Sequence, residues 1–176
     1  DIDIFIKDQV SSSTNGEIKI GNIDGNFIVG FRLNEVIYQE EDLIIFSAGN
    51  IYIDPDLSRI ITGKIALSQL VINNSYYNYD NQKSESQISP DKSSLISWRF
   101  DISSLIIEKS LFIYKESAYD LQGDLKFGYN DGTQIDISKL QVKSSKFLSP
   151  LVLSVGIIEI YNEEWIISNL TAQSEW

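Results

Sequence analysis

Residues 65–75 read IALSQLVINNS, and the apolar residues change phase in the middle of this segment. Ile65 and Leu67 alternate with small or polar residues, which is the period of a half-buried β-strand. The next strong apolar residues, Leu70 and Ile72, begin three positions after Leu67 instead of two. A one-residue slip turns every later side chain to the opposite face, unless one extra residue is absorbed in a β-bulge. The segment therefore predicts a strand that either changes face or contains a bulge.

The same slip recurs along the chain. Related segments read FRLNEVIYQEE (31–41), FDISSLIIEKS (100–110), IDISKLQVKSS (135–145) and, more loosely, WIISNLTAQSE (165–175). The slip falls at a Ser or Asn in every copy, namely Asn34, Ser68, Ser103, Ser138 and Ser168, with spacings of 34, 35, 35 and 30. Strands rich in Ile and Ser can match through composition alone, but five copies of one slip favour a structural repeat.

Composition and turn signals predict an all-β domain. The 176 residues are 43% hydrophobic and 11% aromatic, Ile dominates, and this is strand-forming composition. Short turns such as Asn130-Asp131-Gly132 separate extended runs and predict a long antiparallel meander of repeated strands in a single domain, 1–176. The expected strands span 17–23, 27–38, 43–53, 60–73, 95–114, 118–129, 133–146, 150–161 and 164–173.

Two segments depart from the strand pattern. Residues 73–94 are polar and predict a long loop, with a tolerated surface insertion favoured over a functional excursion. Residues 2–13 leave a strand and a short N-terminal helix both open, because their apolar residues fit either period. The abrupt start at Asp1 suggests a fragment of a longer chain.

If each slip is a bulge, the apolar residues of every copy stay on one broad sheet face. A contiguous apolar face of this size must be covered. One solution is a curled, taco-like sheet that encloses an apolar groove with lipid acyl chains inside, and the other is a sandwich of two sheets. The candidate lipid-facing residues are Leu33, Val36, Ile65, Leu67, Leu70, Ile72, Phe100, Ile102, Leu105, Ile107, Ile135, Ile137, Leu140 and Val142.

Charge and residue types exclude several functions. The net charge of −11 argues against nucleic-acid binding, which requires Lys and Arg to neutralise phosphates. The chain contains no His and no Cys, which removes imidazole acid–base chemistry, thiol nucleophiles and the usual zinc sites. Asp54 and Asp56 flank a proline and fit a turn better than a catalytic pair, and the acids at 40–42, 131 and 136 lack calcium-loop spacing. We expect no enzyme activity, no cofactor and no metal.

Several segments resemble the N-terminal region of the TamB and AsmA-like proteins of Gram-negative bacteria. The shared pattern is a strand ending Ile-x-Gly, a Gly-Phe-x-Leu-x-x-Val strand, an Ile-x-Ile ending and a Gly-x-Ile-x-Ile-x-x-Leu-x-Ile strand, in which this chain has Leu67 for the second Ile. These places are held here by 23–25, 30–36, 51–53 and 63–72. The motifs are degenerate strand patterns, and the family's membrane anchor and C-terminal domain are absent from this sequence.

The resemblance implies a function in lipid transport. It implies a periplasmic protein, anchored to the inner membrane through a segment absent from this chain, whose β-groove shelters phospholipid acyl chains and supports outer-membrane biogenesis. It also implies an outer-membrane barrel protein of the assembly-module type as a partner. Two alternatives stay open: a structural or protein-binding module such as an adhesin or assembly scaffold, and, much less favoured, a glycan-cleaving enzyme with two carboxylates.

Overall fold

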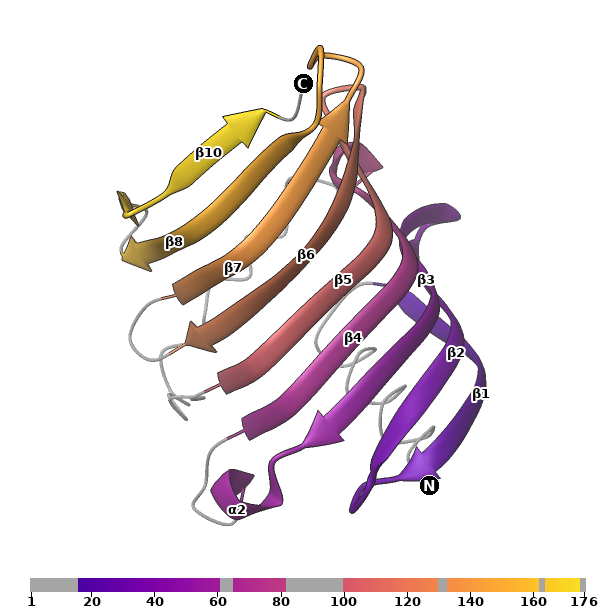
Figure 1. Ribbon diagram of the computed structural model, residues 1–176. Helices are drawn as coiled ribbons and strands as arrows, with labels where there is room; N and C mark the ends of the chain where they lie inside the picture. The colour runs from indigo at the N-terminus through magenta and orange to yellow at the C-terminus, as the bar shows by residue number, and fades with distance from the viewer. Residues whose placement is uncertain (1–15, 61–64, 82–99, 130–132, 162–163, 175–176) are drawn as a thin grey trace.

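The computed structural model describes residues 16–60, 65–81, 100–129, 133–161 and 164–174, and these form one ten-stranded sheet (Figure 1). A short helix, α2 (Leu57–Ile60), and a 3₁₀ turn, η1 (Tyr79–Asn81), lie between strands. The strands are β1 (Glu17–Asn26), β2 (Gly30–Glu40), β3 (Leu43–Pro55), β4 (Ile65–Asn78), β5 (Phe100–Tyr114), β6 (Ser117–Tyr129), β7 (Thr133–Ser144), β8 (Leu151–Tyr161), β9 (Glu164–Ser168) and β10 (Thr171–Ser174). The expected all-β fold is confirmed.

Neighbours in sequence are neighbours in the sheet. The order is β1-β2-β3-β4-β5-β6-β7-β8-β10, and β9 also pairs with β8. Every pairing is antiparallel except that of β4 with β5, which is parallel. The expectation of antiparallel pairing throughout is therefore wrong at this one place. A short hairpin can join two antiparallel strands, whereas a parallel pair needs a long connection. Residues 79–99 separate β4 from β5 and are numerous enough for such a connection.

The sheet is one curled layer, in which β1–β3 turn away from the plane of β6–β8 (Figure 1). The curled sheet is thus confirmed, and the two-sheet sandwich is not what the described strands form. The open question of strand or helix at residues 2–13 falls outside the described residues.

The bulges lie where the sequence slips. Between β3 and β4 the register shifts as Asp54 pairs with Gln69 and Pro55 pairs with Leu67, which leaves Ser68 as the extra residue. The register between β5 and β6 shifts in the same way around Ser103, between Ile102 and Leu105. Between β6 and β7 the register shifts because Asp124 pairs with Lys139 and Leu125 pairs with Ile137, which leaves Ser138 as the extra residue. Of the two possibilities, the slip is therefore a bulge in these three copies, whereas at Asn34 the β2–β3 register continues without a shift.

A second row of irregular residues crosses the sheet where residues within strands adopt positive φ. Glu35, Asn74 and Lys109 have φ values of 53°, 51° and 49°. Gly49 lies beside Asn74, and a Cβ on this glycine would be 3.2 Å from the Cβ of Asn74. Bulges and left-handed residues raise the local twist and bend strands, so the two rows account for the curl.

Several expected boundaries change. Ile60, expected to open a strand, is instead the last residue of α2. Residues 27–29, expected to open a strand, form the turn between β1 and β2. Residues 73–78, expected in a loop, continue β4, and η1 follows, while residues 82–94 lie outside the described residues. The strand expected over 164–173 is divided into β9 and β10 near Asn169, whose φ is 55°.

Candidate functional site

The register places the sequence-predicted apolar residues on one face of the sheet. Residues that are direct partners on adjacent strands have side chains on the same face. One row of such partners crosses nine strands and consists of Ile23, Leu33, Ile51, Ile72, Ile107, Gly123, Leu140, Leu153 and Ala172. We call the side of the sheet that carries this row the apolar face.

The remaining candidates lie in parallel rows of the same face. One row contains Leu67, Ile102, Phe127 and Ile135. A second row contains Leu70, Leu105, Leu125 and Ile137. A third row begins with Val36 on β2 and reaches Val142 on β7. Ile65 and Phe100 are register partners of each other at the start of β4 and β5. The structure therefore gathers the candidates whose side chains it describes on a single surface, although it does not test what they contact.

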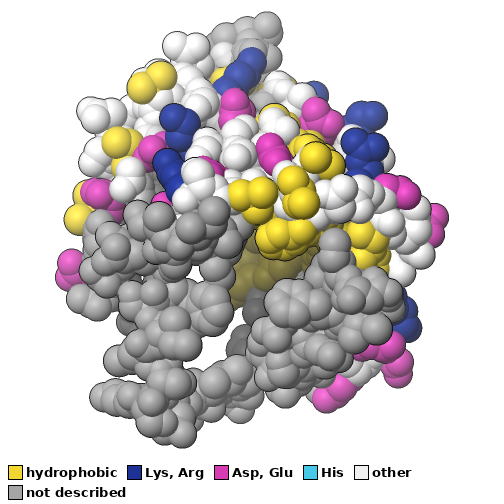
Figure 2. Space-filling view, turned by 90° about the horizontal axis from the view of Figure 1, so that it is seen from below, with side chains coloured by type: hydrophobic (Ala, Val, Ile, Leu, Met, Phe, Trp, Pro, Cys, Tyr) yellow, Lys and Arg dark blue, Asp and Glu magenta, His cyan; other side chains and the backbone are white. Residues whose placement is uncertain are grey.

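The apolar face is buried over most of the sheet, since Leu33 and Val36 on β2, Ile102 on β5, Leu125 on β6 and Ile137 on β7 are 2–7% exposed, and it is exposed at β9, where Ile167 is 57% exposed. Phe31, Leu33, Val36 and Ala48 form a buried cluster, against which Ile18, Ile20, Ile23, Phe46, Ile51, Ile53 and Ile72 pack. In the view from below, hydrophobic side chains gather in the hollow of the molecule, with charged and other polar side chains outside it (Figure 2). No second layer of described helices or strands packs on this face.

Two hydroxyl groups interrupt the apolar face. Ser75 donates a hydrogen bond of 2.6 Å to the Oγ of Ser110, which is only 7% exposed. Ser110 in turn lies 3.4 Å from the carbonyl oxygen of Glu108 and donates to it. Sequence reasoning missed this pair, although both serines close copies of the repeat and so stand at equivalent positions. The two hydroxyls satisfy each other, which allows them to lie on an apolar surface.

Aromatic side chains line the end of the apolar face near the β5–β6 turn. Tyr77 stacks on Phe112 with ring centroids 5.6 Å apart, and Phe112 contacts Tyr119 at 6.3 Å. Tyr119 then contacts Phe147 of the β7–β8 connection at 6.5 Å. Burial raises the pKa of Tyr77 above its usual value, and the nearby Tyr79 and Glu40 add to this effect. The Tyr run at 76–79 thus contributes two rings to a continuous aromatic strip, because Tyr79 contacts Tyr114 at 5.3 Å and Tyr114 stacks on Phe112.

The opposite face is polar, and a row of register partners defines it: Asn22, Asn34, Asn50, Asn73 and Glu108. We call it the polar face. The α2 helix packs here against β4, where Ala66 is 1% exposed. The backbone N–H of Asp56 donates to the carbonyl oxygen of Ala66 at 2.9 Å, which holds this corner in place.

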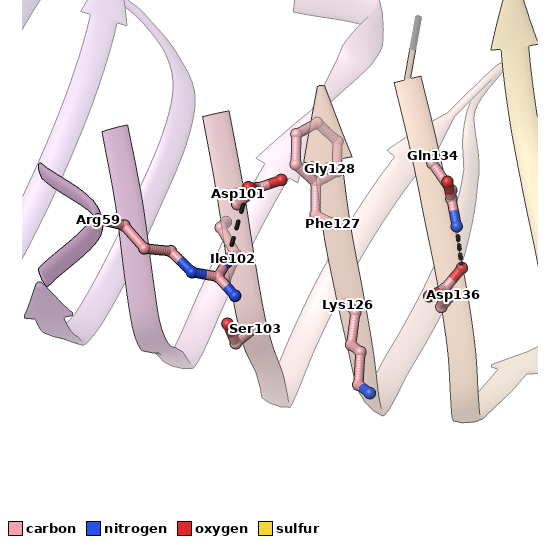
Figure 3. Close-up of a pocket in the computed structure, with 9 residues that line it drawn as sticks. All are labelled: Arg59, Asp101, Ile102, Ser103, Lys126, Phe127, Gly128, Gln134 and Asp136. Atoms are coloured by element: carbon pink, nitrogen blue, oxygen red, sulfur yellow. Dashed lines mark hydrogen bonds and ion pairs between the residues drawn. The ribbon is translucent and has the colours of Figure 1, made fainter. Parts of the chain in front are cut away.

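A pocket of 330 Å³ opens beside α2, and its carboxylates have partners (Figure 3). Arg59 reaches from α2 to Asp101 on β5, with Nη1 3.7 Å from the carboxylate. Gln134 donates to Asp136 at 2.8 Å. The lining residues are Arg59, Asp101, Ile102, Ser103, Lys126, Phe127, Gly128, Gln134 and Asp136, which include no histidine or cysteine. We therefore assign no catalytic role to this pocket.

The acidic candidates have structural roles. Asp54 belongs to β3, and Asp56 caps α2 by accepting hydrogen bonds from the hydroxyl of Ser58 at 2.6 Å and the N–H of Arg59 at 3.2 Å. The Ser58 hydrogen bond lowers the pKa of Asp56, assisted by Arg59 and opposed by partial desolvation. Asp131 lies outside the described residues. Within the described ranges, no three His, Cys, Asp or Glu side chains form a metal-binding group.

Comparisons with known proteins leave the family open. No family model, no curated protein and no solved structure matches the chain. In the described part of the chain, none of the helices has the length and apolar character to cross a membrane. The candidate site therefore rests on the geometry of the apolar face alone.

Proposed function

We propose that the apolar face holds phospholipid acyl chains, as one segment of a β-groove that carries or shelters lipid. One observation carries this proposal: aliphatic and aromatic side chains form continuous rows across the sheet, and no second described layer packs on them. A monomeric protein rarely exposes a contiguous apolar patch above a few hundred Å². Leu33, Ile102 and Ile137 are only 4–5% exposed, so acyl chains would cover the parts of the apolar face that stay open to solvent.

Acyl chains suit this surface better than a sugar or a peptide. Both of those ligands carry many hydrogen-bonding groups, which cost free energy when they are buried without partners. The apolar face offers few such partners, because Ser75 and Ser110 already bond to each other. An acyl chain needs none. Location in the periplasm, an inner-membrane anchor and an outer-membrane barrel partner belong to the same proposal and rest on the family resemblance alone.

Photo-crosslinking in cells tests the proposal with matched pairs of positions. A photoreactive residue at Ile107 or Leu140 lies on the apolar face, whereas one at the adjacent Glu108 or Lys139 lies on the polar face of the same strand. We expect phospholipid adducts, identified by mass spectrometry, at Ile107 and Leu140 only. Equal labelling at all four positions, or labelling at the polar pair alone, would contradict the proposal.

A protein-binding function is a second candidate, and β9 favours it. Trp165, Ile166 and Ile167 are 65%, 49% and 57% exposed on β9, which among the described strands pairs with β8 alone. Exposed apolar edge strands can accept a strand from a partner. Replacing Ile166 by proline should then abolish peptide capture at β9 while leaving lipid adducts at Leu140 intact. Peptide capture that survives this change would contradict binding at the edge of β9.

A further inference from the structure

The turn between β1 and β2 exposes three consecutive apolar side chains. Phe27, Ile28 and Val29 are 48%, 74% and 68% exposed. We call these three residues the apolar tip. Hairpin turns normally carry Gly, Asn, Asp or Ser, so a run of large apolar residues at such a place calls for a function.

Two of the three backbone N–H groups of the apolar tip have a partner within the turn. The Oδ1 of Asn26 accepts hydrogen bonds from the N–H groups of Ile28 at 2.9 Å and Val29 at 3.2 Å. Transfer of an unpaired N–H donor from water to an apolar phase is unfavourable. The Asn26 side chain removes this cost for two of the donors. It therefore lowers the cost of moving the apolar tip into a medium that offers no hydrogen bonds.

The apolar tip is continuous with the buried end of the apolar face. The ring of Phe27 stacks on Phe31 with centroids 6.0 Å apart, and Phe31 belongs to the buried cluster. The surrounding charge is balanced, because Asp24 is the direct strand partner of Arg32. A neutral apolar projection can approach an uncharged surface, even though the chain as a whole, at −11, is repelled by an anionic one.

We propose that the apolar tip inserts into the surface of a zwitterionic lipid bilayer. The other exposed apolar sites fit this role less well: Phe147 and Leu148 follow Lys146, and the apolar residues of β9 lie along a strand instead of projecting from a turn. The inference deepens the proposed function by placing a bilayer beside the apolar face. Only the passage of lipid between the bilayer and the apolar face depends on the proposed function, because insertion of the apolar tip can be measured by itself.

The chain contains no cysteine, so a single engineered cysteine can be labelled cleanly. Ile28→Cys carrying the fluorophore NBD should brighten and shift to shorter wavelength when phosphatidylcholine vesicles are added, and nitroxide-labelled lipids should quench it. The matched control is Lys143→Cys, on an exposed position of β7, which should change little. The unlabelled double variant Ile28→Ser/Val29→Ser should lose about tenfold or more of its vesicle binding in flotation.

Each contrary result is specific. No spectral change at position 28, or an equal change at 28 and 143, would overturn insertion of the tip. A change that appears without vesicles and grows with protein concentration would show that the tip contacts a second copy instead of a bilayer, and would also overturn it. Crosslinking at Leu140 tests separately whether acyl chains contact the apolar face. Lipid binding by the apolar face and insertion of the apolar tip can therefore fail independently.

Discussion

The two ends of the sheet share one apolar face but bury it to very different degrees. At the β2 end, Val36 is 2% exposed and Leu33 is 5% exposed. At the β9 end, Trp165 is 65% and Ile167 is 57% exposed, although the register places Ile167 on the same face through Ile158 and Ile135. Alternation and register thus determine which face is apolar, whereas neighbouring strands and curvature determine how much of it reaches solvent.

The largest expected effect separates the two ends. Phe31→Ala removes a ring from the buried cluster and should lower the free energy of unfolding by about 3–5 kcal/mol. Ile167→Ala, at the exposed end, should cost less than about 1 kcal/mol, because its side chain stays mostly in water. Urea denaturation of both variants measures the difference. Similar losses would mean that the exposed end is covered in solution.

A second substitution probes the middle of the face. A Cβ on Gly123 would lie 2.6 Å from the carbonyl oxygen of Lys139, which is backbone and cannot move aside. Gly123→Ala should therefore cost about 1–3 kcal/mol, the range of overpacked sites. At Gly128 the nearest atom is the flexible Asp101 carboxylate at 3.3 Å, so Gly128→Ala should stay within about 0.5 kcal/mol of the parent. Thermal melts of both variants test the contrast.

The serine pair tests the junction of β4 and β5. Ser75→Ala leaves the buried hydroxyl of Ser110 without its donor and should cost about 1–2 kcal/mol. Ser75→Ala/Ser110→Ala removes both hydroxyls and should cost less than the sum of the single variants. A double-mutant cycle from urea titrations measures this coupling. Additive losses would show that the two hydroxyls act independently.

The smallest effect depends on pH at the aromatic strip. Because the pKa of Tyr77 is raised above its usual 10.0 in the folded state, folding favours the protonated phenol. Its contribution to stability is full below pH 10 and is lost as the pH rises through the higher folded-state pKa. Tyr77→Phe should therefore lose less stability than the parent between neutral and strongly alkaline pH. Equal losses of stability at alkaline pH in both proteins would show that ionisation of Tyr77 does not cause the pH dependence.

Much of the fold could be predicted from local patterns. The slips at Ser68, Ser103 and Ser138 coincide with bulges, and each bulge keeps Leu70, Leu105 or Leu140 on the face of the residues before it. The apolar face followed from these bulges. Its division into a buried and an exposed end could not be predicted, since alternation is the same at both ends.

Other features had weaker or misleading signals. The residue types of Asp24-Gly25-Asn26 are typical of a turn, yet these residues pair with β2, and the turn is built by the apolar residues that follow them. The parallel pairing of β4 with β5 leaves no local signal, because the partner strand lies beyond a long connection. The serine pair was visible in the repeat as an equivalent position but could not be distinguished there from solvent-exposed polar residues.

The parallel pairing of β4 with β5 also divides the folding process. Strands β1–β4 and β5–β10 are each joined by short connections, and such hairpins form within about 1–10 µs. Ser75 and Ser110, which meet between β4 and β5, are 35 residues apart, so joining the two halves requires the closure of a much longer loop. We expect the halves to form first and the β4–β5 ladder last. Pulse-labelling hydrogen exchange should then show the amides of this ladder gaining protection after those of the β2–β3 and β6–β7 hairpins.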